Sequence, residues 1–247
     1  MTQSQMLFRV YFLSQSKTDS GLPAGIGSIS SPTKRAWTLG FPFDCIVIEG
    51  NGSGEESDLL FIGDWLKKNG YGYSIGETSR SIRLDKEKGN SRQKEAVSLY
   101  VARAALIAFF ESAGSFLEQS KEWVVRSYSK YSKVTTLQLL TADEVREKHD
   151  RSLMLRVRLE STCSLLADPF NTNWKELREF GAGKQGPTLE QLESLMSSWE
   201  SIQEALELLM DRVSEKKFLF WEMLAEYMIV VLILLELVIG IMDYIHT

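Results

Sequence analysis

The longest hydrophobic stretch in the chain runs from Phe218 to Met242 and carries no charged residue other than Glu222, Glu226 and Glu236. An α-helix rises ~1.5 Å per residue, so this stretch is long enough to cross a hydrocarbon core of roughly 30 Å. A central acid such as Glu236 costs ~2.5–3.5 kcal/mol to insert, whereas each Leu, Ile or Val returns about 0.3–0.6 kcal/mol. We therefore predict a transmembrane helix over residues 218–243. The alternative is a buried helix of a soluble core.

The three acids of this stretch share one helix face with a glycine. At about 100° per residue, Glu222, Glu226, Glu236 and Gly240 fall within an arc of roughly 80°. A charge in lipid has to face protein or water, and glycine lets a neighbouring helix approach closely. We predict that this face packs against another membrane helix. The alternative, a proton or cation pathway through an oligomer, would use the same face.

Charges on either side of the stretch predict its orientation. Arg212, Lys216 and Lys217 precede it, whereas Asp243 follows it. Cationic flanks stay on the cytoplasmic side, so the N-terminal body is expected to face the cytoplasm or the matrix. The bilayer would be the inner membrane of a bacterium or of a mitochondrion.

An amphipathic, coiled-coil-like helix is predicted over residues 187–217, directly before the membrane stretch. Thr188 and Gln191 have capping-box spacing, which starts a helix. Acids fall on the outer positions of its heptads, so the apolar face is broad. That face either packs within the chain's own bundle or joins several chains. Its apolar positions are Leu192, Leu195, Trp199, Ile202, Leu206, Leu209 and Val213.

The body of the chain predicts an α+β fold. Strand-like runs occur at Leu7–Leu13, Cys45–Glu49 and Ser81–Leu84, with a helical run at Ser57–Asn69 between the last two. These runs define an α+β domain over residues 1–90.

Long helices follow in a helical region over residues 91–180. Their expected bounds are Arg92–Lys130 and Ala142–Ala167, with Leu99–Phe110 as the most buried part.

Glycines offer a weak nucleotide-binding signal, and no cofactor is predicted. Gly25 and Gly27 are followed by Ser30 where the dinucleotide fingerprint needs a third glycine. In the linker of residues 181–187, Gln185 follows Lys184 where a phosphate loop needs Ser or Thr. Other glycines, at positions 50, 52, 54, 70, 72 and 76, bracket the first helix as turns. An enzyme that binds a nucleotide with these loops remains the alternative function.

Composition and charge limit the classes of protein to which the chain could belong. Lys and Arg number 28 against 33 Asp and Glu, for a net charge of −5, so overall charge does not favour a nucleic-acid coat. The Cys and His residues of the chain are only Cys45, Cys163, His149 and His246, and no zinc finger or other metal site is predicted from them.

A local basic–aromatic patch occurs where the first long helix ends. It consists of Lys121, Arg126, Lys130 and Lys133, interleaved with Trp123, Tyr128 and Tyr131. Such a patch binds RNA or anionic lipid headgroups. The alternative is a solvated helix face.

Four segments together resemble one family, the required-for-meiotic-nuclear-division family, also called the Sad1-interacting-factor family. They are Phe43–Gly50 (FDCIVIEG), Leu99–Leu117 (LYVARAALIAFFESAGSFL), Leu165–Trp174 (LLADPFNTNW) and Glu226–Glu236 (EYMIVVLILLE). The chain departs from the family pattern at Tyr227, where Trp is usual, and in the segment 1–35.

The resemblance implies a single-span membrane protein of bacteria, mitochondria or fungal cells. Mitochondrial members of the family support organelle translation as inner-membrane oligomers that tether ribosomes. Glu226, Glu236, Pro169 and Trp174 match its motifs and are expected to be structural. The expected function is a non-catalytic, membrane-anchored oligomeric scaffold. Its expected partners are the bilayer, copies of itself, and a protein, ribosome or RNA.

Overall fold

The computed structural model describes residues 5–15, 22–50, 54–71, 73–85, 93–132, 142–168 and 186–246. The chain forms two compact units. Met1–Glu118 and Leu153–Trp199 make the first, and Gln119–Ser152 and Glu200–Thr247 make the second. The unit boundaries cut across long helices, so the sheet shares its unit with parts of the helices that follow it.

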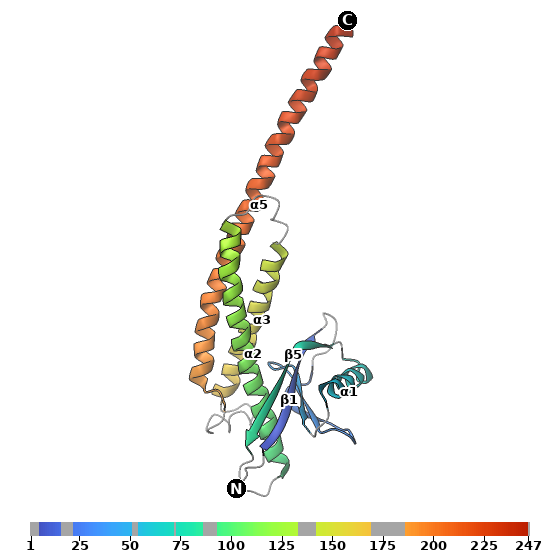
Figure 1. Ribbon diagram of the computed structural model, residues 1–247, viewed down its shortest axis with the longest axis vertical. Helices are drawn as coiled ribbons and strands as arrows, with labels where there is room; N and C mark the ends of the chain where they lie inside the picture. The colour runs from blue at the N-terminus through green and yellow to red at the C-terminus, as the bar shows by residue number, and fades with distance from the viewer. Residues whose placement is uncertain are drawn as a thin grey trace. The chain divides into compact units, whose positions relative to one another are not determined.

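The first unit is built on one antiparallel sheet with the strand order β2-β3-β4-β1-β5 (Figure 1). Every paired neighbour in this sheet is antiparallel. The strands are β1 Gln5–Gln15, β2 Ile26–Ile29, β3 Ala36–Leu39, β4 Cys45–Glu49 and β5 Tyr73–Asp85.

Both faces of the sheet are buried, which explains why β1 reads as an almost continuous apolar run. Phe8 and Val10 point to one hydrophobic cluster, while Tyr11 and Leu13 point to another. Successive side chains of a strand lie on opposite faces, so each face takes every second residue.

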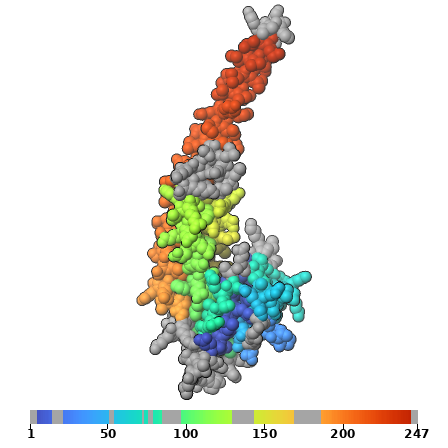
Figure 2. Space-filling model, in the orientation of Figure 1, coloured from blue at the N-terminus to red at the C-terminus, as the bar shows by residue number. Residues whose placement is uncertain are grey.

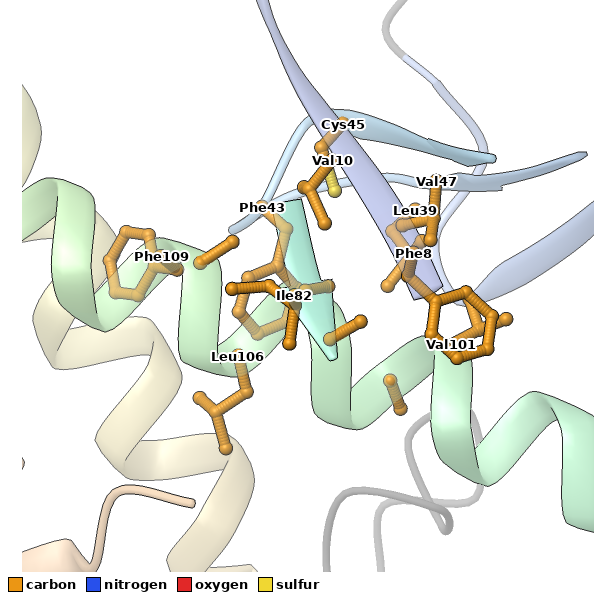
Figure 3. Packing of buried hydrophobic residues seen from close by; sticks show 14 of the residues in the cluster. Phe8, Val10, Leu39, Phe43, Cys45, Val47, Ile82, Val101, Leu106 and Phe109 are labelled. Carbon is orange, nitrogen blue, oxygen red and sulfur yellow. The ribbon is translucent and has the colours of Figure 1, made fainter. Parts of the chain in front are cut away.

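One face is covered by helix α2, Gln93–Ser132 (Figure 3). Val101, Leu106 and Phe109 of α2 share a cluster with Phe8 and Phe43 of the sheet unit. The Phe43 and Phe109 rings meet edge to face, with centroids 5.7 Å apart. The same cluster includes five buried alanines of α2, whose small side chains let the helix lie close to the strands; they are Ala102, Ala104, Ala105, Ala108 and Ala113.

Two further helices contribute to this cluster. They are α3, Ala142–Ala167, through Leu159, and α5, Leu189–His246, through Leu192.

The opposite face is covered by helix α1, Glu55–Lys68. Its Ile62 and Leu66 pack in a second cluster with Tyr11, Ile46 and Ile48.

A buried carboxylate also joins α1 to the sheet. Asp58 is fully buried, and its Oδ2 lies 2.7 Å from Nε of Arg9 and accepts a 3.0 Å hydrogen bond from the Tyr11 hydroxyl. Lys34 pairs with its other oxygen. Burial, together with the charge of Asp58, raises the pKa of Tyr11, so this hydroxyl keeps its proton as a donor. A buried acid is tolerated here because opposite charges and a donor surround it.

A second polar link ties α3 to the β3–β4 turn. Asp44 has a left-handed backbone, with φ 42°, and its carbonyl accepts a 2.8 Å hydrogen bond from the Leu13 N–H. Arg158 of α3 donates to the Asp44 carboxylate at 3.1 Å. Burial raises the pKa of this carboxyl, and Arg158 acts in the opposite direction.

The α+β prediction is confirmed, and several elements match closely. Strand Cys45–Glu49 and helix Ala142–Ala167 have the bounds expected from the sequence, whereas Ser81–Leu84 is only the end of the longer β5. Strands β2 and β3 were not predicted, because four residues each are too short to show a clear period of two.

Replacing Asp58 with Ala should destabilise the protein by about 3–5 kcal/mol, because two buried cations lose their shared partner. The surface pair of Arg126 and Glu122 is the control, since both side chains are exposed (80% and 68%) and Glu122→Ala should cost less than about 1 kcal/mol. Denaturant unfolding of the purified protein measures both. Equal losses would show that the Asp58 cluster does not hold α1 on the sheet.

Replacing Asp44 with Asn should flatten the pH dependence of stability in the acidic range. The folded pKa of Asp44 lies above its ordinary value of 3.8, so this carboxyl supports folding most below 3.8 and loses that contribution as pH rises through the folded pKa. Asn keeps the side-chain shape and tolerates the left-handed backbone.

The measurement is the unfolding midpoint from about pH 4 to pH 7, with the exposed Asp64→Asn as the matched control. An unchanged pH slope in Asp44→Asn would contradict the prediction.

Candidate membrane-spanning segment and its supporting helices

Helix α5 is one uninterrupted helix of 58 residues, Leu189–His246. The capping box at its start is present as the sequence predicts. The Thr188 N–H donates to Oε1 of Gln191 at 2.9 Å, and the Gln191 N–H donates to Oγ1 of Thr188 at 3.3 Å. No proline lies between Leu189 and His246, and Gly240 is the one glycine, so nothing in the sequence interrupts the helix.

The first part of α5 buries the apolar face that its heptads define. Leu192, Trp199, Ile202, Leu206, Leu209 and Val213 are buried, and Leu195 is partly buried. In the first unit, Leu192 belongs to the sheet cluster, and the Arg156 guanidinium lies 5.1 Å from the centre of the Trp199 ring. Of the two arrangements left open by the sequence, packing within the chain is the one that these side chains adopt.

In the second unit, parts of α2, α3 and α5 contact one another in pairs. Nε1 of Trp123 in α2 donates to Glu144 of α3 at 3.0 Å. The Ser152 hydroxyl of α3 donates to Oε1 of Gln203 in α5 at 3.1 Å. The Arg212 guanidinium of α5 lies 4.6 Å from the centre of the Tyr128 ring in α2. These contacts define a three-helix bundle within this unit.

Past this bundle α5 continues as a long helix (Figures 1 and 2), and its residues 218–242 are apolar except for Glu222, Glu226 and Glu236. Its most apolar window has a mean hydropathy of 2.5, and none of that window is buried. Leu232 and Leu237, for example, are 60% and 59% exposed. Soluble proteins rarely expose a continuous apolar surface of this size. The segment is therefore long and apolar enough to cross a membrane and is consistent with a membrane anchor.

A second helix passes the same test of length and composition, but its surroundings differ. The segment Val97–Tyr128 of α2 has a mean hydropathy of 1.3, and 56% of its window is buried. Its apolar side chains pack on the sheet, so the fold itself accounts for their hydrophobicity.

The acidic face of the membrane segment is exposed in the single chain. Glu222, Glu226, Glu236 and Gly240 are all exposed, and a Cβ built on Gly240 would meet no described atom within 4 Å. The predicted packing of this face against another helix therefore stays a prediction, and its partner would come from outside the described part of this chain.

The basic–aromatic patch is more neutral than its sequence indicates. Lys121 and Arg126 are exposed, and Arg126 pairs with Glu122 one turn earlier at 3.1 Å. The side chain of Lys130 and the whole of Lys133 lie outside the described residues, so half of the predicted patch has no structural description.

Two described glycines of the N-terminal loops have a structural reason to be glycine. Gly25 has a φ of 93°, and a Cβ on Gly27 would lie 2.7 Å from the Thr38 hydroxyl of the neighbouring strand. Helix α1 starts next to Gly54 with Glu55, Glu56 and Asp58 in its first turn, and these acids would repel a phosphate.

Some predicted features lie outside the described residues. These are Gly52, Gly72, Lys184 and Gln185 of the glycine loops, and Pro169 and Trp174 of the family motif.

The two cysteine thiols lie in surroundings that lower their reactivity. Cys45 is buried in β4, and burial raises the pKa of its thiol. Burial likewise raises the pKa of Cys163, whose Sγ lies 3.8 Å from the Met196 sulfur. A thiol with a raised pKa is a poor nucleophile at neutral pH. Among the described residues no group of three or more His, Cys, Asp or Glu side chains forms a metal-binding cluster.

Two of the surface depressions in the described part of the chain have defined linings, and neither lining gathers a catalytic set of side chains. The first, about 400 Å³, is lined by Phe41, Pro42 and α3 residues that include Glu160. The second, about 550 Å³, lies beside Arg83 and Phe110.

Comparisons with protein-family models and with curated proteins give no match for this chain. The structure itself defines the candidate site as an exposed, mostly apolar helical segment that continues from a packed helical bundle.

Removing residues 218–247 should release the protein from membranes, because the other apolar helix of spanning length among the described residues, Val97–Tyr128, packs in the core. The measurement is extraction of a membrane fraction at alkaline pH, with the full chain as the control. Circular dichroism of the truncated protein should still show the helical bundle. If the truncated protein stays in the pellet while folded, residues 218–247 are not the anchor.

Proposed function

We propose that this protein is a membrane-anchored, oligomeric scaffold with a tethering rather than catalytic role. The observation that carries the proposal is the exposed apolar half of α5, which is continuous with the helix that packs against α2 and α3. An uninterrupted helix is a stiff connection, so the three-helix bundle of the second unit would be held close to the bilayer. Such a connection suits a tether.

The body is proposed to face the cytoplasm or the matrix. Arg212, Lys216 and Lys217 precede the membrane segment, and Asp243 follows it. Cations next to a span are retained on the side where the chain is made. A bacterial inner membrane or a mitochondrial inner membrane is the proposed location.

Self-association is assigned to the membrane segment alone. The apolar face from Leu192 to Val213 is used inside the chain, so it is not offered to a second copy. The acidic stripe with Gly240 is exposed, and in lipid it would need a polar partner. A second copy of the same helix supplies matching acids and a matching glycine, and a protonated acid can donate to an ionised one across the contact.

The resemblance to the required-for-meiotic-nuclear-division family supports the same proposal. The segment Phe43–Gly50 includes β4 in the sheet core, and Leu99–Leu117 lies on α2 in the same core. Members of that family act as membrane-bound oligomers that support translation or membrane organisation. We extend this role to the present chain, with a ribosome or another protein as the tethered partner.

A conducting oligomer is the second candidate, and the alignment of Glu222, Glu226 and Glu236 favours it. Acids gathered on one face of a spanning helix often mark an ion or proton path. Because each chain offers one spanning helix, several copies would have to surround the path.

Replacing Glu236 with Leu should leave insertion intact and weaken the oligomer. The central acid costs ~2.5–3.5 kcal/mol to place in lipid, so Leu favours the spanning state. The lost polar contact between helices is about 0.6–2 kcal/mol per site. Glu222→Leu is the matched control, since Glu222 lies only four positions from the start of the segment, closer to an interface than Glu236, and should lose less.

Membrane retention and oligomer mass in detergent are measured for both variants. If Glu236→Leu assembles like the parent, the acidic face is not a packing contact. A proton flux that Glu236→Leu abolishes in proteoliposomes would instead favour the conducting oligomer.

A further inference from the structure

The buried stripe of α5 ends in cations, at the level where the three-helix bundle ends. Leu206, Leu209 and Val213 are buried, and the next position of this stripe is Lys216, which is half-buried. Lys217 follows and is exposed. Within one turn, apolar side chains that face other helices give way to ammonium groups.

The position of α2 beside this turn comes from one contact. The Arg212 guanidinium lies 4.6 Å from the centre of the Tyr128 ring, so Tyr128 of α2 is level with Arg212 of α5. Both helices run in the same direction in this unit (Figure 1). Helix α2 continues from Tyr128 to Ser132, one further turn, which brings its end to the level of Lys216.

The helical rise sets the distance from this level to lipid. Arg212 precedes Phe218 by six positions, which corresponds to about 9 Å along the axis. A bilayer of ~40–45 Å with a hydrocarbon core of ~30 Å has a headgroup layer of roughly 5–8 Å on each side. Arg212, Lys216 and Lys217 therefore fall in or just outside the headgroup layer when residues 218–242 span the core.

The cations and the acids of this turn occupy different sides of α5. At about 100° per residue, Arg212 and Lys216 lie along one edge of the buried stripe, and Lys217 lies along its other edge. Asp211 and Glu215 lie on the outer side, away from the stripe. The cations thus border the junction of α5 with its neighbouring helices, and the Tyr128 ring holds Arg212 at one edge.

We propose that Arg212, Lys216 and Lys217 form a binding site for anionic phospholipid headgroups at the membrane-facing end of the bundle. A lipid headgroup and a free phosphate would both bind through a phosphate group beside these cations, with Arg212 donating hydrogen bonds from its planar guanidinium. The lipid is favoured over a soluble anion because the insertion of α5 places these three side chains among headgroups. This inference rests on the proposed insertion of residues 218–242.

The test uses the full chain in nanodiscs made either of zwitterionic phosphatidylcholine or of a mixture with anionic phosphatidylglycerol. Native mass spectrometry of the released protein counts phosphatidylglycerol molecules that stay bound. The double variant Lys216→Gln/Lys217→Gln should retain anionic lipid with about fivefold lower affinity per cation removed. Lys67→Gln/Lys68→Gln makes the same charge change on the exposed last turn of α1 and should bind like the parent.

Three outcomes separate the possibilities. Equal retention of phosphatidylglycerol by the parent and by both double variants, all resistant to alkaline extraction, would overturn the lipid site and leave the anchor intact. If the parent protein itself is extracted from membranes at alkaline pH, residues 218–242 are not a membrane anchor. Displacement of the bound lipid by millimolar inorganic phosphate or by an RNA oligonucleotide would overturn the preference for a lipid.

A variant of the ring completes the test. Tyr128→Leu keeps all three cations but removes the face on which Arg212 rests. It should reduce lipid retention less than the double variant, with unchanged thermal unfolding in detergent. A loss as large as that of the double variant would show that bundle integrity, rather than charge, controls the binding.

Discussion

The structure depends on one constraint, that a single unbroken helix meets two different surroundings. The first part of α5 shows an apolar stripe to the rest of the chain and polar residues to water, whereas residues 218–242 are apolar on every side except the stripe of three acids. Neighbouring helices can bury a narrow apolar stripe, but the apolar surface of residues 218–242 is too broad for the contact with one bundle to cover. The change between them falls at Lys216 and Lys217, and there the helix leaves its protein neighbours. The proposed anchor and the proposed headgroup site both follow from the position of this change.

The sheet of the first unit also has apolar surfaces that other elements must cover. Its strands bury both faces, so the sheet needs a helix on each side, and α1 and α2 provide them. The α2 side is sealed by apolar contact alone near Phe43 and Phe109. The α1 side adds the Asp58 cluster, in which a fully buried acid is neutralised by Arg9 and Lys34. Such a cluster fixes the position of a helix more sharply than apolar packing does, since its charges tolerate no shift without losing a partner.

The proposed anchor differs from the other long apolar helix in its surroundings. Hydrophobicity alone does not identify the anchor, because α2 also has the length and composition of a span. The difference is that α2 finds apolar partners in the sheet, whereas residues 218–242 find none among the described residues.

The sequence by itself determined the features that depend on neighbours along the chain. The capping box at Thr188, the bounds of Ala142–Ala167 and the length of the apolar stretch are local, because helix hydrogen bonds and side-chain periods involve residues only three or four apart. The heptad face from Leu192 to Val213 was also readable, since burial follows the same period.

Tertiary structure decided everything that joins distant residues. The strand order β2-β3-β4-β1-β5 places β1 between β4 and β5, and no local pattern encodes which strands pair. Asp58 reads in the sequence as a surface acid in the first turn of a helix, and it is buried only because Arg9 and Lys34 arrive from other segments. Arg158 reaches Asp44 across 114 positions of the chain. The apolar stripe of α5 is likewise covered by α2 and α3. A periodic apolar face in the sequence predicts that the face is buried, but it does not identify the helices that bury it.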